Sequence, residues 1–424
     1  MRPILAIANG EYAGSAAPAG PRPGEAHAPA ALPGLDRWTR AAFRLLARLA
    51  VGRLTVVLPD GRTVRFDGSA PGPEATVRVH DRRSARRFML GGDLAFAEAY
   101  MDGSVDSPDP AALTELFARN KQAIDHDALP GPLRVALRRI MHWMNANTRR
   151  GSRRNIAYHY DLGNAFYERW LDPSMTYSAA RFEHPGQALE AAQDAKYRRL
   201  AELLELRPGQ RVLEIGCGWG GFAVLAAREF GCSVHGVTLS REQHAFAVER
   251  ARRAGVADRV SFEIRDYRDL DGRYDRVASI EMFEAVGERW WNRFFELLNA
   301  RLVPGGRAAL QVITIAEAGF REYRSNPDFI QRHIFPGGML PTLGHLRGLG
   351  EAQGLAVSAV ETFGLDYART LAIWRERFLA QWDGIAPLGF DDRFRRMWDY
   401  YLAYCEGGFR AGHIDVCQIA YVRS

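Results

Sequence analysis

Short apolar runs alternate with helical segments through the second half of the chain. The runs of strand length are RVLEI (211–215), SVHGV (233–237), VSFEI (260–264), YDRVASI (274–280) and RAALQVITI (307–315). This alternation predicts an α/β fold in which a parallel sheet is built from strands joined by crossover helices. Two later runs, 355–363 and 414–422, are predicted as edge strands, and the second is expected to pair antiparallel.

A smaller domain is predicted ahead of this sheet, at residues 35–129. Residues 38–51 have helical periodicity, and further helices are expected at 93–100 and 110–121. Two strand-like runs flank Asp60-Gly61, which is the signal of a β-hairpin. The sequence therefore predicts a mainly helical N-terminal domain that contains one hairpin.

Two further segments are distinguished by their composition. Residues 1–34 are rich in Ala, Pro and Gly and are predicted to form a flexible tail, because they cannot bury enough apolar surface. Residues 130–154 are predicted to form a basic amphipathic linker helix. Its apolar stripe favours packing on the next domain, at 155–424, over the alternative of lying on an anionic membrane surface.

Composition and charge narrow the classes of function. The chain has 424 residues, of which 47% are hydrophobic and 25% charged, as in ordinary globular proteins. Its formal charge of +6 comes almost entirely from arginine and suits anionic lipids, nucleic acid or simple solubility. Because no nucleic-acid reader motif accompanies the charge, we do not expect a nucleic-acid partner.

The compartment is predicted from cysteines and apolar runs. The four cysteines show no metal-ligand spacing, which favours a reduced cytoplasmic protein without a metal site. No run approaches the ~18 apolar residues of a membrane span, and the first residues are too weakly apolar for a secretory signal. A lipid substrate would have to be reached from the water side, by a protein peripheral to the inner membrane surface.

A glycine-rich turn follows the first strand of the predicted sheet. VLEIGCGWGG (212–221) places an acidic residue near the strand end, then glycines that include Gly216 and Gly218. Glycine permits a tight turn and a close approach of a ligand to the backbone. The spacing differs from the GxGxxG of dinucleotide sites and suits S-adenosylmethionine, although many such turns are only structural.

Polar residues at the ends of the next two strands support this cofactor. Thr238 and Gln243 follow the second strand, and Asp266 and Tyr267 follow the third, where they are placed to contact the adenine amine and ring. Ligands of open α/β sheets bind at these carboxyl ends. Ser240 and Gln243 also have the spacing of a helix-capping box, and both roles are compatible.

Several long motifs carry a resemblance to a known family. They are YHYDLGNAFYERWLDPSMTYSAARF (158–182), SIEMFEAVG (279–287), FIQRHIFPGGMLPT (329–342), LDYARTLAIWRERF (365–378) and YYLAYCEGGFRAGHIDVCQIAYV (400–422). With the glycine-rich turn, the chain from about 158 resembles cyclopropane-fatty-acyl-phospholipid synthases and mycolic acid methyltransferases. The resemblance implies a Rossmann-like class I S-adenosylmethionine-dependent methyltransferase fold, and the longer synthases suggest a homodimer.

The same resemblance implies a reaction and its participants. A methyl carbon is transferred to the double bond of an unsaturated acyl chain in a membrane phospholipid bilayer, and proton loss then closes a cyclopropane ring. A bound bicarbonate ion serves as the base in the family. The matching positions are Tyr177 and Ser178 for the cofactor, Glu284 and Tyr367 for the bicarbonate, and His159, Tyr160 and Asp161 for a lid.

Two departures from the family pattern concern the bicarbonate. Ala179 stands where the family has a cysteine, and Gln311 stands where it has a histidine. Bicarbonate bound by Glu284, Gln311 and Tyr367 would still give the expected cyclopropane. A different base would give a methylated or methylene-branched chain, and Glu281 is a candidate because neighbouring carboxylates raise one pKa. A local cap or salt bridge is the favoured interpretation of Glu281 at this point.

Two other classes of function remain open. The same fold hosts methyltransferases of small molecules, although the long motifs argue against that assignment. A cofactor- or lipid-binding protein with a decayed catalytic site would also fit the changes at Ala179 and Gln311.

Overall fold

The computed structural model describes residues 34–125 and 162–424. It contains a four-stranded sheet near the N-terminus and a seven-stranded sheet in the remainder of the chain. Residues 1–33 of the tail predicted at 1–34, the linker helix predicted at 130–154 and the lid residues His159, Tyr160 and Asp161 lie outside the described residues.

The N-terminal domain confirms the predicted hairpin and enlarges it. Its strands pair in the order β2-β1-β3-β4. Helices still provide the larger share of its regular residues. The elements are α1 (Arg37–Leu46), β1 (Val51–Val57), β2 (Thr63–Asp67), β3 (Ala70–Val79), α2 (Ser84–Met101), β4 (Val105–Asp106), α3 (Pro110–Arg119) and α4 (Lys121–Asp125).

Two sequence features explain why the predicted and observed elements of this domain differ. The helix predicted to Val51 ends at Leu46, because alternate positions from Gly52 to Val56 are buried as in a strand. Strand β3 escaped prediction because Pro71 and Pro73 interrupt its first half, where its pairing with β1 shifts register. Proline is tolerated at such irregular positions.

The larger sheet has the order β10-β11-β9-β8-β5-β6-β7. Within the stretch β9-β8-β5-β6-β7 the paired strands run parallel to one another, as the alternating pattern predicts. Their bounds are β5 (Arg211–Ile215), β6 (Ser233–Thr238), β7 (Val260–Ile264), β8 (Tyr274–Ile280) and β9 (Leu302–Ile315), followed by β10 (Leu355–Thr362) and β11 (Ile414–Arg423).

The prediction of two edge strands is half wrong. β10 is an edge strand, but β11 lies between β10 and β9 and is antiparallel to both. Six consecutive residues of β11 are buried, which is the burial of an internal strand covered on both faces. The antiparallel pairing itself was predicted correctly.

Helices cover both faces of the larger sheet. α8 (Leu189–Leu203) and α9 (Gly221–Phe230) share an apolar core with one face, and α10 (Arg241–Arg253) packs beside them. α11 (Trp291–Arg301) and α13 (Leu343–Ala352) cover the other face. Shorter elements are α7 (Asn164–Tyr167), η1 (Tyr267–Asp269), η2 (Phe283–Ala285), η3 (Glu288–Trp290), α12 (Glu317–Ser325), η4 (Ile330–Ile334), α15 (Trp382–Ile385) and η5 (Ala386–Leu388).

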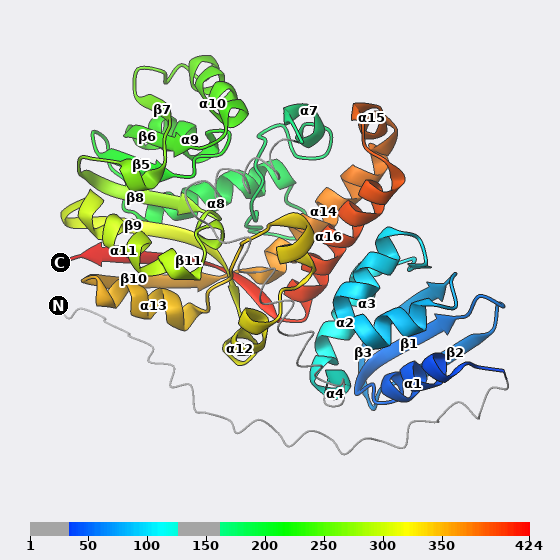
Figure 1. The fold of residues 1–424 in the computed structure, drawn as a ribbon. Helices are drawn as coiled ribbons and strands as arrows, with labels where there is room; N and C mark the ends of the chain where they lie inside the picture. The colour runs from blue at the N-terminus through cyan, green and yellow to red at the C-terminus, as the bar shows by residue number, and fades with distance from the viewer. Residues whose placement is uncertain (1–33, 126–161) are drawn as a thin grey trace, which may run out of the picture.

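Two long helices join the domains. α14 (Gly364–Ala380) and α16 (Asp392–Arg410) lie between the larger sheet and the N-terminal domain (Figure 1). Thr114 Oγ1 on α3 donates to the Ala403 carbonyl oxygen on α16 at 2.8 Å. Tyr100 Oη donates to Asp399 at 2.7 Å. The N-terminal domain therefore rests on the helix layer that also lines the candidate site.

Gly407 on α16 allows this close contact between the domains. A Cβ atom there would lie 2.3 Å from Thr114 Oγ1 and 2.5 Å from the Glu115 backbone nitrogen. We expect Gly407→Ala to lower the free energy of unfolding by about 1–3 kcal/mol, because α3 and α16 must move apart.

The matched control is Gly348→Ala in α13, where a Cβ would meet no described atom within 4 Å. That change should stabilise the protein by up to about 1 kcal/mol, through helix propensity. Thermal and urea unfolding of both variants check the contact, and equal stability of the two would contradict it.

Candidate active site

The glycine-rich turn between β5 and α9 is built as a binding loop. Gly216, Gly218 and Gly220 have φ angles of 79°, 50° and 79°, which glycine adopts without strain. A Cβ on Gly216 would lie 2.7 Å from Met282, and one on Gly220 would lie 2.9 Å from Phe262. A Cβ on Gly218 would meet no described atom within 4 Å. The loop thus leaves space beside Gly218, at the carboxyl end of β5, where a nucleoside cofactor fits.

Thr238 and Gln243 lie beside this loop, after β6. Thr238 Oγ1 donates to Gln243 Oε1 at 2.8 Å, and both side chains are buried. The Ser240 hydroxyl accepts a hydrogen bond from the Gln243 backbone nitrogen at 3.3 Å and caps α10. The capping role predicted for Ser240 is confirmed, and the cofactor contacts of Thr238 and Gln243 stay predictions.

Asp266 and Tyr267 follow β7, as predicted, but Asp266 already has a strong partner. Its carboxylate accepts from Arg268 Nε at 2.8 Å and from Nη2 at 2.6 Å, and little of either side chain is exposed. Arg268 would therefore share Asp266 with an adenine amine. Sequence reasoning missed this ion pair, although the spacing in RDYRDL was the available signal.

Tyr177 belongs to a cluster of aromatic rings above the glycine loop. Its hydroxyl hydrogen-bonds to the Tyr401 hydroxyl at 2.8 Å. Its ring centroid lies 5.4 Å from both Trp374 and Tyr167, and Tyr167 also packs against Trp219 of the glycine loop. The faces of such rings attract a cation.

Ser178 has a partner that the sequence analysis did not identify. Lys196 on α8 is fully buried, and its Nζ donates to Ser178 Oγ at 2.5 Å. Burial lowers the pKa of Lys196 to about 7, although Glu281 and other carboxylates favour its charged form. Lys196 is one of only two lysines in a chain whose cations are otherwise all arginine, and this was the signal available in the sequence.

The carboxylate of Glu281 is held by three donors. Oε1 accepts from the Ala179 backbone nitrogen and from Gln311 Nε2, both at 2.8 Å, and Oε2 accepts from Tyr367 Oη at 2.7 Å. Glu281 has a φ of 49°, which is uncommon for a residue with a side chain and is typical of constrained functional positions. The local cap or salt bridge favoured from the sequence is wrong.

Burial and hydrogen bonds act on Glu281 in opposite directions. Burial raises the pKa of Glu281, while Lys196 and the three donors oppose that shift. A carboxylate in such a site ionises closer to neutral pH than an exposed one. It is therefore suited to accept a proton from a neighbouring carbon acid.

Glu284 lies on the next turn, η2, and has a different environment. Its Oε1 accepts from the Ile313 backbone nitrogen at 2.5 Å. Its buried Oε2 has no hydrogen-bond partner within 34–125 and 162–424. Burial raises the pKa of Glu284 to about 8, and the negative charge of Glu281 adds to this effect. Glu284 is thus held as a neutral acid near neutral pH.

The described residues do not fit a bicarbonate ion. Tyr367 and Gln311 come together as the family pattern implies, but their donor groups point to Glu281, as does the nitrogen of Ala179. Ile313, a further donor nearby, is bound to Glu284. A bound anion would compete with the Glu281 carboxylate for these donors and would lie beside its negative charge, which is unfavourable.

Comparison with known proteins identifies the family of this chain. The model of the mycolic acid cyclopropane synthetase family matches residues 147–419. The chain belongs to this family. A mycolic acid cyclopropane synthase solved in complex with SAH and CTAB has a TM-score of 0.60 and 30% identity, covering 64% of this chain and 98% of that chain. Together these findings support an S-adenosylmethionine-dependent methyltransferase with the predicted Rossmann-like fold.

Two relatives extend over both domains. The tuberculostearic acid methyltransferase of Mycobacterium tuberculosis is 39% identical over 407 residues, which cover 90% of this chain and 92% of the relative. The cyclopropane-fatty-acyl-phospholipid synthase of Escherichia coli is 36% identical over 391 residues, which cover 92% and 94%. The family thus modifies lipids, and its members are named for different products.

Across the two described ranges, no helix combines the length and apolar character that a transmembrane span requires.

The open space beside Gly218 gives a test of the cofactor loop. Gly218→Ala should weaken binding of S-adenosylhomocysteine at least about tenfold, because the methyl group strains the loop and enters the binding space. Gly209→Ala is the matched control, since Gly209 also has a positive φ of 80° and open surroundings. Calorimetric titration that finds equal affinity for the two variants would contradict this site.

The raised pKa of Glu284 predicts a dependence of stability on pH. Its folded pKa of about 8 exceeds the ordinary 4.5, so its favourable contribution is complete below 4.5 and is lost as pH rises through 8. Glu284→Gln should therefore flatten the decline of unfolding free energy over this window, by up to about 1.4 kcal/mol per pH unit.

Urea unfolding at a series of pH values measures this slope. The exposed Glu376→Gln on α14 is the control and should leave the slope unchanged. An unchanged slope in Glu284→Gln would show that Glu284 is ionised in the folded protein.

Proposed function

We propose that the enzyme transfers a methyl carbon to the double bond of an unsaturated phospholipid acyl chain and that Glu281 is the proton acceptor. The product is a methylene-branched chain. The observation that carries this proposal is the carboxylate of Glu281, which takes the three donors of the anion site. The decayed-site alternative is not favoured, because that arrangement is complete and buried.

The balance of atoms limits the possible products. Bound S-adenosylmethionine supplies an electrophilic methyl group. The π electrons of the alkene form the new C–C bond as the C–S bond breaks, which leaves a cation on the adjacent chain carbon. Loss of one proton then gives a net gain of CH₂. A saturated methyl branch would also need a hydride donor, so the product is either a cyclopropane or an alkene.

The greater stability of a tertiary cation favours the alkene. Immediate loss of a proton from the new methyl group closes a ring. A 1,2-hydride shift first would move the charge to the more stable tertiary branch carbon, and proton loss from the methyl group then gives an exocyclic methylene. The three hydrogen bonds hold the Glu281 carboxylate in one position, and they oppose but do not cancel the rise in its pKa on burial.

The aromatic rings around the site support a cationic reaction. Tyr177 lies beside Trp374, and Tyr367 lies 6.1 Å from the same ring, centroid to centroid. The negative faces of such rings attract a cation in a site from which water is excluded. Tyr367 thus connects the two parts of the site, because its hydroxyl also binds Glu281.

The membrane substrate is a further part of the proposal. Among the relatives, the Escherichia coli protein, which is named for phospholipid, matches across both domains. We infer that this enzyme reaches acyl chains from the cytoplasmic face of the bilayer as a peripheral protein, and that it acts as a homodimer.

Glu281→Gln tests the base directly. The amide keeps the shape of the side chain but cannot accept the proton, so turnover should fall by about 10²–10⁴-fold. Affinity for S-adenosylhomocysteine should stay within about threefold. Glu351→Gln, an exposed change on α13, is the control. Radiolabelled methyl transfer to vesicles of a monounsaturated phosphatidylglycerol measures turnover, and wild-type rates in Glu281→Gln would exclude this residue as the base.

The product is tested in a host that lacks its own acyl-methylating enzymes. Mass spectrometry should find acyl chains heavier by one CH₂, and proton NMR should show the olefinic signal of an exocyclic methylene. High-field cyclopropane methylene signals in its place would contradict the branched product. The mass alone does not decide, because both products have the same composition.

A further inference from the structure

Two buried glutamines lie opposite each other on adjacent strands of the larger sheet. Gln311 on β9 pairs in direct register with Gln418 on β11, and neither side chain is exposed to solvent. The neighbouring positions of both strands are mostly apolar. Burying two amides costs free energy unless their hydrogen bonds are satisfied, so their presence in this core requires an explanation.

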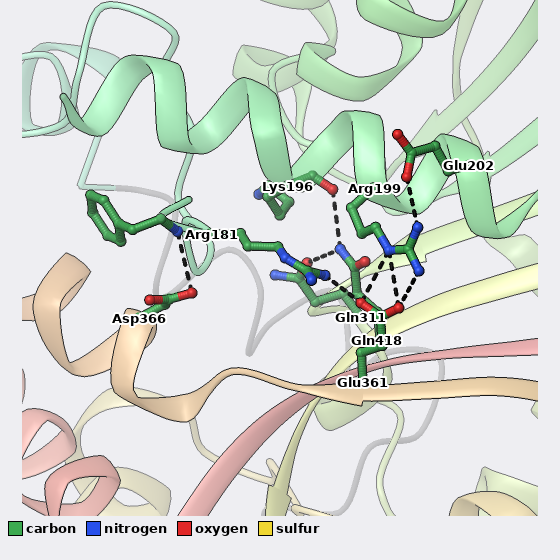
Figure 2. Close-up of polar contacts among 9 residues, drawn as sticks. Arg181, Lys196, Arg199, Glu202, Gln311, Glu361, Asp366 and Gln418 are labelled. Atoms are coloured by element: carbon green, nitrogen blue, oxygen red, sulfur yellow. Dashed lines mark hydrogen bonds and ion pairs between the residues drawn. The ribbon is translucent and has the colours of Figure 1, made fainter. Parts of the chain in front are cut away.

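The hydrogen bonds between them have a fixed direction. Gln418 Nε2 donates to the main-chain oxygen of Lys196 at 3.1 Å and to Gln311 Oε1 at 3.0 Å. Gln311 Nε2 then donates to Glu281 Oε1 at 2.8 Å. Figure 2 shows Gln418 between Lys196 on α8 and Gln311 on the sheet. A main-chain carbonyl cannot donate, so it sets the orientation of the Gln418 amide.

Gln418 fixes the orientation of Gln311 together with the Ala179 carbonyl oxygen, which accepts from Gln311 Nε2 at 3.4 Å. If the Gln311 amide turned over, its oxygen would face the Glu281 carboxylate and its nitrogen would face the nitrogen of Gln418. Both contacts would be repulsive, and the carboxylate would lose one of its three donors. The series of hydrogen bonds from Lys196 through Gln418 and Gln311 to Glu281 thus keeps an N–H group of Gln311 directed at the Glu281 carboxylate.

We propose that Gln418 is a positioning residue, which fixes the side-chain amide of Gln311 so that its N–H group faces the Glu281 carboxylate. The proposal rests on the proposed function of Glu281 as the base. Gln418 itself does not reach Glu281 and acts through Gln311.

An apolar residue at position 418 would pack in the core without burying an unsatisfied polar atom. The Oε1 atom of Gln418 is buried and lacks a partner among the residues that the structure describes. Such an orphaned acceptor costs free energy, so the fold gains little from this glutamine as a packing residue. The role of Gln418 is therefore to orient the side-chain amide of Gln311.

Several charged or titratable groups surround Glu281, and all influence its ionisation. Tyr367 approaches from α14, Lys196 from α8 and Glu284 from η2. The removal of one donor from the carboxylate disfavours its charged form. Loss of the Gln418 amide should therefore raise the pH at which Glu281 becomes an active base.

The experiment compares pH profiles of methyl transfer to monounsaturated phosphatidylglycerol vesicles. Gln418→Met keeps the volume but removes the donor, and Gln418→Glu keeps the shape but reverses its polarity. In both variants the acidic limb of kcat should move up by about one pH unit, so that activity falls about tenfold at pH 6 and less than threefold at pH 8.5. KM for S-adenosylmethionine should change less than twofold.

A destabilising control separates orientation from packing. Val416→Ala lies on the same strand and the same face, and it removes buried apolar volume without touching the amide chain. It should lower the thermal unfolding temperature without moving the acidic limb. An equal shift of the limb in Val416→Ala, or an unshifted limb in Gln418→Met and Gln418→Glu, would overturn the proposal.

A double-mutant comparison tests whether Gln418 acts through Gln311. In a Gln311→Met background, the further change Gln418→Met should have no additional effect on the acidic limb. A full additional shift would overturn the proposal. The variant Glu281→Gln distinguishes the claim that Glu281 is the base from the claim that Gln418 positions Gln311. If that variant keeps turnover and the acidic limb, the proposed base is wrong, whereas its loss of activity together with unshifted Gln418 variants refutes only the positioning role.

Discussion

The site depends on one interaction, the burial of the Glu281 carboxylate among three hydrogen-bond donors. The donors come from the loop after Tyr177, from β9 and from α14, which are far apart in the sequence. An unpaired carboxylate in this position would be too costly to bury, and the donors reduce that cost. The same contacts connect the loop, the sheet and the helix layer, so the geometry of the base and the packing of the domain cannot vary independently.

This constraint also explains the changes from the family pattern. A backbone nitrogen at Ala179 and the amide of Gln311 are neutral donors that match a carboxylate supplied by the chain itself. Gln311 and Glu281 are therefore parts of one arrangement, and the donor at position 179 is a backbone group that does not depend on the side chain. The neutral acid at Glu284 fits the same account, because two adjacent buried carboxylates do not both ionise readily.

Local patterns in the sequence predicted the sheet and the cofactor loop well. The strands β5, β7 and β8 match their apolar runs to the residue, because parallel strands are short, largely apolar segments bounded by loops. The position of β11 could not be read in this way, since a buried run does not reveal its neighbours. The proline-rich strand β3 lacked the alternating pattern altogether.

The candidate site was only partly accessible from the sequence. Gln311 and Tyr367 were identified through motifs, and they do lie together, but around a side chain rather than an ion. Glu281 was noted for its charge, yet its contacts are non-local and depend on a φ of 49° that no pattern announced. Lys196 and Gln418 have no local signature of function, because their roles arise from three-dimensional neighbours.

The central claim is that the proton acceptor is Glu281, a residue of the protein itself, and not a bound bicarbonate ion. It is tested most directly by the rate of methyl transfer in buffer freed of carbon dioxide, compared with the same buffer after bicarbonate is added back at constant pH. The account predicts the same rate in both, because the three donors already bind Glu281. A rate that collapses without bicarbonate and recovers when it is restored would contradict the account.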